Sequence, residues 1–175
     1  AVSIKPDYAE AYNNIGITFQ DQGKLPEAIE AYTKALSIQA DFAETYNNMG
    51  VALKDQGKLD KATEAYNKAL SIKPDFAEAY RNLSNTKKYT ATDHQFIKVK
   101  NLVDSESIND ESKCSLSFAL AKMYEDIGEL DQAFKHLSQG NRLRKNLLKY
   151  SIEQDERLFN KLKKTQPALL ENSLE

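Results

Sequence analysis

The feature that most constrains the fold is a 34-residue segment that occurs twice in succession. Residues 6–39 align with residues 40–73 without a gap, and 21 of the 34 positions are identical. A third copy begins at "PDFAEAYRNL" and diverges after Leu83. A fixed period of roughly 20–50 residues is typical of repeat proteins, whose units bury their apolar faces only by stacking. The sequence therefore predicts an array of stacked units.

Each unit has the pattern of a helical hairpin. Tyr12, Ile15 and Phe19 share one face of a predicted helix, and Gly23 interrupts the pattern with a residue that favours a left-handed turn. A second helix follows, and the small residues of both helices allow a close approach. Its predicted inner face is formed by Ala28, Tyr32 and Ala35. We also expect an aspartate to cap the first helix of each unit, with a glutamate three residues later; the pairs are Asp7 and Glu10, Asp41 and Glu44, and Asp75 and Glu78.

These residues resemble the signature of the tetratricopeptide repeat (TPR) family. The matching positions are Tyr12, Ile15, Gly16, Phe19, Ala28, Tyr32 and Ala35 in the first unit, and Tyr46, Met49, Gly50, Leu53, Ala62, Tyr66, Ala69 and Pro74 in the second. Ala40 departs from the pattern, since the family usually has proline there. The resemblance implies an all-α, right-handed superhelical solenoid of antiparallel helix pairs, with about nine helices.

The second half of the chain predicts further, divergent helices within one continuous domain. Residues 1–88 contain two full units and the first helix of a third, and residues 89–150 contain divergent TPR-like helices. "SFALAKMYEDIGELDQAFKHLSQGNRLRK" fits the same frame, displaced by three residues. Residues 151–175 are expected to form a C-terminal capping helix and a tail, because "EQDERLFNKLKK" offers a polar outer face.

A second resemblance concerns the context of these helices. "YRNLSNTKKYT", "FALAKMYEDIGELDQAFKHLSQGNRLRK" and "YSIEQDERLF" are similar to the region between the repeats and the catalytic domain of bacterial TPR–sulfotransferase fusion proteins. The resemblance implies that the chain is the non-catalytic N-terminal part of a larger bacterial sulfotransferase, whose missing C-terminal catalytic domain would be a neighbour in the same protein. A stand-alone adaptor and a self-association module are the alternatives.

The chain shows no pattern for catalysis, metal binding or cofactor binding. GxGxxG and GxxxxGK[ST] motifs are absent, and His94, His136 and Cys114 lack metal-ligand spacing. We expect Cys114 to be a small buried residue, although a reactive thiol near a helix start is an alternative. A net charge of −2 gives no argument for nucleic acid, and no apolar run is long enough to cross a membrane. The single cysteine favours a reducing, cytoplasmic location.

Asparagine recurs at one position of each first helix, although it is a poor helix former. We expect Asn14, Asn48 and Asn82 to form a ladder in a concave groove and to bind the backbone of an extended peptide, as in the similar repeats of the O-linked N-acetylglucosamine transferase family. The alternatives are that the amides tie neighbouring helices together or face water. Self-association is also possible, either as a homodimer or with the tail of a neighbouring chain in the groove. The basic, amphipathic "NRLRKNLLKY" segment could contact an acidic partner or form a solvated face. The predicted groove residues are Glu10, Asn13, Asn14, Ile17, Asp21, Asn47, Asn48, Val51, Lys54, Arg81, Asn82 and Asn85.

Overall fold

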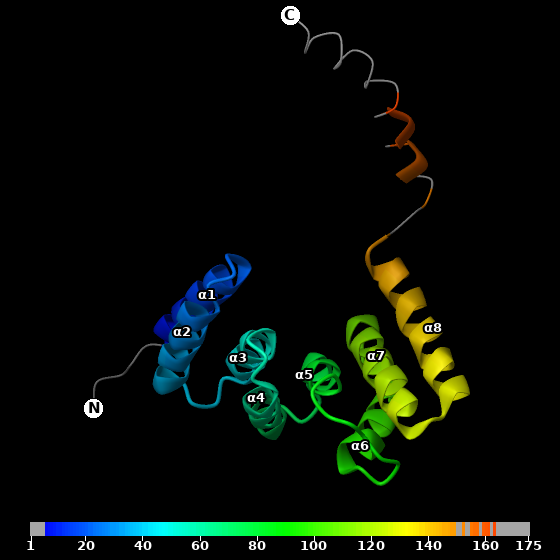
Figure 1. The fold of residues 1–175 in the computed structure, drawn as a ribbon, viewed down its shortest axis with the longest axis horizontal. Helices are drawn as coiled ribbons and strands as arrows, with labels where there is room; N and C mark the ends of the chain where they lie inside the picture. Colours follow the sequence, from blue (N-terminus) through cyan, green and yellow to red (C-terminus); the bar gives the residue numbers. More distant parts are fainter. Residues whose placement is uncertain (1–5, 150–151, 153–154, 158, 162, 164–175) are drawn as a thin grey trace, which may run out of the picture.

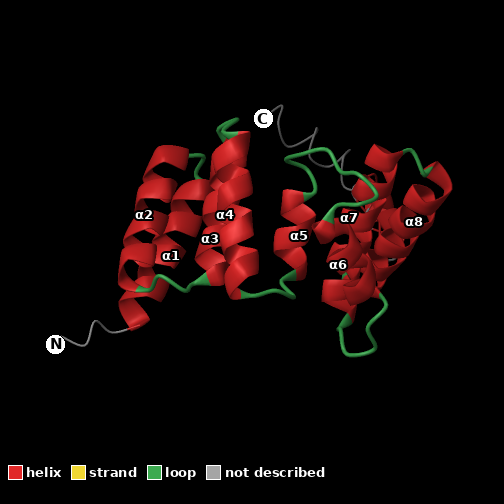
Figure 2. Cartoon of the chain, turned by 90° about the horizontal axis from the view of Figure 1, so that it is seen from below, coloured by secondary structure: helices red, strands yellow, loops and turns green. Residues whose placement is uncertain are grey.

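The computed structural model describes residues 6–149, 152, 155–157, 159–161 and 163. Within this part of the chain all regular structure is helical, and no strand occurs (Figure 2). Eight helices have defined bounds: α1 (Pro6–Asp21), α2 (Leu25–Ile38), α3 (Ala43–Asp55), α4 (Leu59–Ile72), α5 (Ala77–Leu83), α6 (His94–Val103), α7 (Asp110–Ile127) and α8 (Leu130–Leu147). The described residues between 152 and 163 are also helical.

The helices stack side by side into an arc. Successive helices α1 and α2, α3 and α4, and α7 and α8 form the closest pairs. Figure 1 shows α3, α5 and α7 along the inner side of the arc, and α4 and α6 on its outer side. We call the packing of α3 and α4 on α1 and α2 the first junction, and the packing of α5 and α6 on α3 and α4 the second junction. The predicted all-α solenoid of antiparallel helix pairs is confirmed.

Within a unit, a glycine of the first helix receives a tyrosine ring of the second. A Cβ atom at Gly50 would lie 2.5 Å from Cε1 of Tyr66, and a Cβ atom at Gly16 would lie 2.4 Å from Cε1 of Tyr32. Any larger residue would therefore force the paired helices apart. Gly57, with φ of 76°, forms the left-handed turn between α3 and α4.

The core continues from the second unit into the divergent helices after residue 88, which we call the divergent half. Tyr66, Leu83, Val99, Leu120 and Met123 are fully buried in one cluster that extends from α4 to α7. The first unit is less enclosed, and Ile15 on the predicted inner face of α1 is 43% exposed. No described unit packs on that side of α1, so the face that is covered in the second unit stays open in the first.

The third unit differs from the first two because its first helix is short. After the seven residues of α5, the chain runs through a loop of residues 84–93 before α6 begins. Lys88 in this loop donates a 2.8 Å hydrogen bond to Asp126 of α7, whose carboxylate also pairs with Lys122. Burial raises the pKa of Asp126, but hydrogen bonds from both lysines outweigh it, so the net pKa is lowered.

The predicted aspartate caps are wrong. Helices α3 and α5 begin after Phe42 and Phe76, which occupy the N-cap positions without a side-chain hydrogen bond. Asp41 and Asp75 therefore lie one residue too early to cap, and α1 begins at Pro6, ahead of Asp7. Both phenylalanines are half-buried, and Phe76 packs against the core.

Most of the predicted capping helix and tail, residues 151–175, lies outside the described residues. Of those described, Ile152 and Phe159 are exposed. Leu130 and Phe134, on the preceding helix α8, are exposed as well. The capping role of this segment stays a prediction.

Candidate functional site

The inner side of the arc carries the recurring asparagines. Asn13 and Asn47 are buried, whereas Asn48 and Asn82 are half-buried and Asn14 is exposed. The two adjacent asparagines of a unit differ in burial, because the side chains of adjacent residues in a helix point about 100° apart. The three predicted ladder residues are therefore not equivalent.

Two of the ladder amides join neighbouring units. The Asn48 side chain donates a 3.1 Å hydrogen bond to Oδ1 of Asn13, and the Asn82 side chain donates a 2.9 Å bond to Oδ1 of Asn47. Oδ1 of Asn13 also accepts a 3.1 Å bond from the buried hydroxyl of Thr45. The role left as an alternative by the sequence, in which the amides tie helices together, is thus present at both junctions.

These bonds leave part of the polar surface for a ligand. Each asparagine amide has two donor hydrogens and one acceptor oxygen, and Asn48 and Asn82 each use one hydrogen in the bonds above. Among the described residues, the side-chain oxygens of Asn48 and Asn82 receive no hydrogen bond. The peptide-binding role of the ladder stays a prediction.

The other predicted groove residues lie along α1, α3 and α5 and at the beginning of the loop after α5. Their side chains are polar or aliphatic. Nζ of Lys54 lies 3.7 Å from Oδ1 of Asp55, which forms an ion pair. The Asn85 side chain donates to the carbonyl oxygen of Arg81. Exposed members are Glu10, Ile17, Asp21 and Asn85, and half-buried members are Val51, Lys54 and Arg81.

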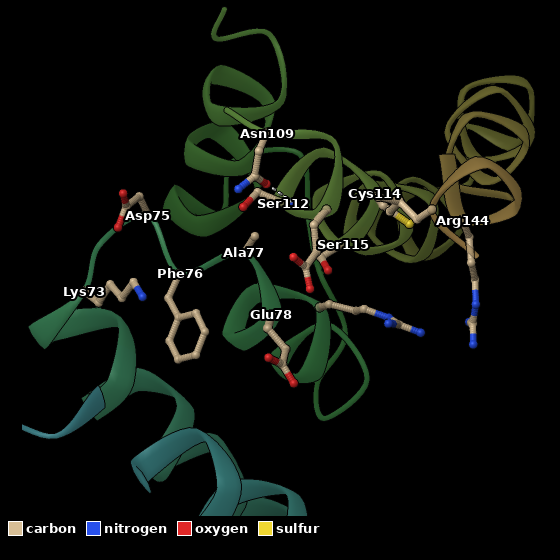
Figure 3. A pocket seen from close by; sticks show the side chains of 13 residues that line it. Lys73, Asp75, Phe76, Ala77, Glu78, Asn109, Ser112, Cys114, Ser115 and Arg144 are labelled. Carbon is tan, nitrogen blue, oxygen red and sulfur yellow. Dashed lines mark hydrogen bonds between the residues drawn. The ribbon is translucent and has the colours of Figure 1, made fainter. Parts of the chain in front are cut away.

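Among the predicted residues, Arg81 lines a distinct pocket. It stands 34 residues after Asn47, in the position that carries the buried asparagine in the first two units. The pocket has a volume of about 610 Å³ and lies between the start of α5, the start of α7 and the end of α8. Figure 3 shows Lys73 and Asp75 on one side of it and Cys114 and Arg144 on the other.

The two arginines of the pocket have no carboxylate partner among the described residues. Cζ of Arg81 lies 5.0 Å from the ring centroid of Phe118 on α7, which fixes its guanidinium by a cation–π contact. No ion pair joins Arg81 or Arg144 to an acidic group among the described residues, although Glu78 and Glu111 also line the pocket. The site therefore offers two planar, positively charged groups that can bind a carboxylate through paired hydrogen bonds.

The cysteine at this site is structural. Cys114 is buried, and its thiol donates to the carbonyl oxygen of Gly140 at 3.4 Å. Burial raises the pKa of the thiol, while the charges of Arg81 and Arg144 act in the opposite direction. A thiol with a raised pKa is a poor nucleophile, because the thiolate is the reactive form.

The described part of the chain has neither a candidate metal site nor a helix suited to span a membrane. In that part of the protein no group of three or more His, Cys, Asp or Glu side chains is placed to hold a metal ion. None of the helices there combines the length and the apolar character that a membrane span requires.

Phe118 and Arg144 were not predicted as site residues. They come from the divergent half, where the repeat frame gives no reliable register against α5. The basic segment "NRLRKNLLKY" contains Arg144 and was the only indication of a charged surface there.

Comparison with known families agrees with the geometry. A family model described as TPR repeat matches residues 18–57, and a second, described as tetratricopeptide repeat, matches residues 43–76. The chain contains tetratricopeptide repeats. No curated protein sequence matches it.

Solved structures of low sequence identity share the fold. The crystal structure of MamA is 22% identical with a TM-score of 0.56, and the alignment covers 83% of this chain and 84% of that one. The crystal structure of BtubC from P. vanneervenii is 18% identical with a TM-score of 0.61, over 84% of this chain and 67% of that one. These alignments are longer than residues 18–76, so the shared fold includes part of the chain outside the matched repeats.

Proposed function

We propose that this TPR chain is a non-catalytic protein-interaction scaffold that binds an extended peptide along the inner side of its arc. The observation that carries the proposal is the pocket of Arg81 and Arg144, whose guanidinium groups form no ion pair with any residue that the structure describes. The pocket follows the row of asparagines on α1, α3 and α5, whose remaining amide groups match the hydrogen-bonding groups of a peptide backbone.

The charges of the pocket favour a particular kind of peptide. A carboxylate side chain would bind Arg81 and Arg144, and the acidic residues Asp75, Glu78 and Glu111 would favour a basic residue close by. Such a mixed pattern gives specificity, because an all-acidic peptide would meet like charges. The contact between Arg81 and Phe118 supports this arrangement, since a guanidinium that is already positioned loses less freedom on binding.

The test is selection of random peptides displayed on phage, followed by affinity measurements with single variants. We expect the selected peptides to carry an acidic residue, and Arg144→Gln to weaken their binding by about tenfold. Arg142→Gln is the matched control, because Arg142 lines a different surface hollow with Phe134 and Ser138. If no peptide is selected, the scaffold proposal is wrong. If peptides bind but ignore Arg81 and Arg144, only the assignment of the pocket is wrong.

We propose further that the chain belongs to a larger bacterial sulfotransferase and acts in the cytoplasm. The similarity of the divergent helices to TPR–sulfotransferase fusion proteins supports this, and the complete reading frame tests it. A phosphosulfate-binding loop downstream of Glu175 is expected. A stop codon there would favour the stand-alone adaptor or the self-association module instead.

A further inference from the structure

A second groove lies on the outer side of the arc, at the first junction. It has a volume of about 810 Å³ between α2 and α4. Its floor is formed by Tyr46, Met49 and Leu53 of α3, which recur at helical spacing, and Ile29 and Ala65 form apolar walls. We call it the outer groove. It does not share any lining residue with the pocket of Arg81.

The rim of the outer groove is positively charged. Lys58, Lys61 and Lys68 line it, against the single acidic residue Glu64. None of these three lysines forms an ion pair with another of the described residues. An apolar floor below unpaired lysines is complementary to a segment that has leucine-like side chains and carboxylates.

At the second junction, the position equivalent to the outer groove is filled by other parts of the chain. One unit further along, Thr63 of α4 donates a 2.8 Å hydrogen bond to Thr86 in the loop, and Gln95 of α6 donates a 2.7 Å bond to Asn67 of α4. Tyr89 from the same loop is buried, and its hydroxyl lies 3.4 Å from Oε1 of Gln95. A short segment of chain with a large apolar side chain therefore completes the second junction.

The corresponding positions of the first junction remain open. Ile29, Thr33 and Lys61 stand 34 residues before Thr63, Asn67 and Gln95, and all three line the outer groove. No described segment covers them. The two junctions thus have equivalent sites on their outer sides. The site at the second junction is filled by residues of the same chain, and the site at the first junction is not filled by any described residue.

One segment of this sequence has the required chemistry. Residues 168–175, "ALLENSLE", contain Leu169, Leu170 and Leu174 together with Glu171 and Glu175, and have no basic residue. A helix formed on binding would place Leu170 and Leu174 on one face and both glutamates on the adjoining face, because each pair is four residues apart.

We propose that the outer groove binds the leucine-rich acidic segment 168–175 of a second copy of this chain. Figure 1 places the described residues between 152 and 163 beyond α8, at the opposite end of the array from α2 and α4. Five residues from 163 to 168 extend at most about 18 Å. A second copy can reach the groove without crossing the whole array. The groove on one copy and the segment on the other make a head-to-tail contact.

The first experiment measures the contact directly. A fluorescein-labelled peptide of residues 165–175, "TQPALLENSLE", is titrated by anisotropy with the full chain carrying Leu170→Ser and Leu174→Ser, so that the protein's own segment cannot compete. We expect saturable binding that weakens about tenfold or more with Lys58→Glu and Lys61→Glu. These substitutions place acidic residues at the start of α4, where they favour the helix. Lys145→Glu, on exposed α8, is the matched control and should leave binding unchanged. Absence of peptide binding, or equal binding by the groove variant, would overturn the proposal.

The second experiment exchanges the charges in the full-length chain. By sedimentation velocity, the wild-type chain should self-associate, and either Lys58→Glu with Lys61→Glu or Glu171→Lys with Glu175→Lys should abolish this. A mixture of the two variants should associate again, because the opposite charges are restored between copies. Failure of the mixture to associate, or self-association that survives Leu170→Ser and Leu174→Ser, would contradict the assigned contact.

Discussion

On the inner side of the arc, the first and second junctions are joined by the same hydrogen bond. Asn48 donates to Asn13 at the first junction, and Asn82 donates to Asn47 at the second. The two bonds are one repeat period apart and have nearly equal lengths. Here the repeated sequence produces a repeated contact.

On the outer side the two junctions differ. The first leaves a groove of about 810 Å³ between α2 and α4, whereas the loop of residues 84–93 and Tyr89 fill the second. The difference arises where the third unit loses its repeat pattern after Leu83. After this point the chain has a loop instead of a long first helix, and the loop lies at the second junction.

The largest effect that tests this comparison is expected from Tyr89→Ala. Removing a buried aromatic side chain leaves a cavity, and we expect the free energy of unfolding in urea to fall by about 3–5 kcal/mol. Met49→Ala at the open first junction should cost less, because Met49 is only half-buried.

Tyr89→Phe provides the control for that prediction. The Tyr89 hydroxyl has one long hydrogen bond, 3.4 Å to Gln95, so its removal should change stability little. Equal losses from Tyr89→Ala and Met49→Ala would show that both junctions are packed alike and that the comparison is wrong.

The next effect concerns the shared inner bond. Asn13→Ala removes the acceptor for Asn48 and for the buried hydroxyl of Thr45, and should cost about 1–3 kcal/mol. Asn47→Ala removes the acceptor for Asn82 alone, and should cost less.

Asn14→Ala is the matched control for both, because Asn14 is exposed and alanine favours the helix. The midpoints of thermal unfolding of the three variants should be lowest for Asn13→Ala, higher for Asn47→Ala and highest for Asn14→Ala. A loss of stability from Asn14→Ala as large as that from Asn13→Ala would be inconsistent with the bonds described.

Much of the structure of the two regular units, residues 6–73, could be predicted from the sequence, because their contacts are local or repeat at a fixed period. The helix pairs, the turn at Gly57 and the contact between Gly50 and Tyr66 follow from spacing and residue size. The direction of the asparagine bonds could not be predicted. It depends on the angle at which one unit stacks on the next, and a small rotation would turn the same amides to water.

The candidate site in the divergent half was harder to predict for a related reason. Arg81 was identified by its period, but Phe118 and Arg144 come from helices whose register against α5 is set by tertiary packing. The predicted aspartate caps are wrong because α3 and α5 begin one residue later than the capping pattern suggests, with half-buried Phe42 and Phe76 at the N-cap positions.

A smaller effect is expected from the buried tyrosines of the first two units. The Tyr32 hydroxyl donates a 2.8 Å hydrogen bond to Gln20, whereas the buried Tyr66 hydroxyl has no partner among the described residues. The sequence explains the difference, since Lys54 replaces glutamine 34 residues after Gln20. Burial raises the pKa of both, that of Tyr32 to about 12.

Tyr32→Phe should therefore cost about 0.5–1.5 kcal/mol, and Tyr66→Phe should be neutral or stabilising. Urea unfolding of the two variants measures the sign directly. If Tyr66→Phe destabilises as much as Tyr32→Phe, a partner for the Tyr66 hydroxyl exists and the two units are equivalent at this position.

The smallest effect is a pH dependence that the divergent half adds beside the second junction. His136 of α8 stacks on Tyr124 of α7 with ring centroids 5.4 Å apart, and Tyr124 meets the edge of Phe96 on α6. Burial lowers the pKa of His136 from its ordinary value of 6.5, with a further decrease from Lys135 and Lys100 and an opposing effect from Asp104. Below that ordinary value the unfolded chain binds the proton more readily than the folded chain, so stability falls as the pH decreases through this range.

His136→Phe keeps a stacked ring and removes the titration. We expect the urea midpoint of the wild-type chain to fall more between pH 7 and pH 5 than that of the variant, with the two curves parallel above pH 7. Other titrating groups are common to both proteins and cancel in the comparison. If the urea midpoint of the variant follows the wild-type curve at every pH, protonation of His136 does not affect stability. The predicted acid sensitivity of the contact with Tyr124 would then be wrong.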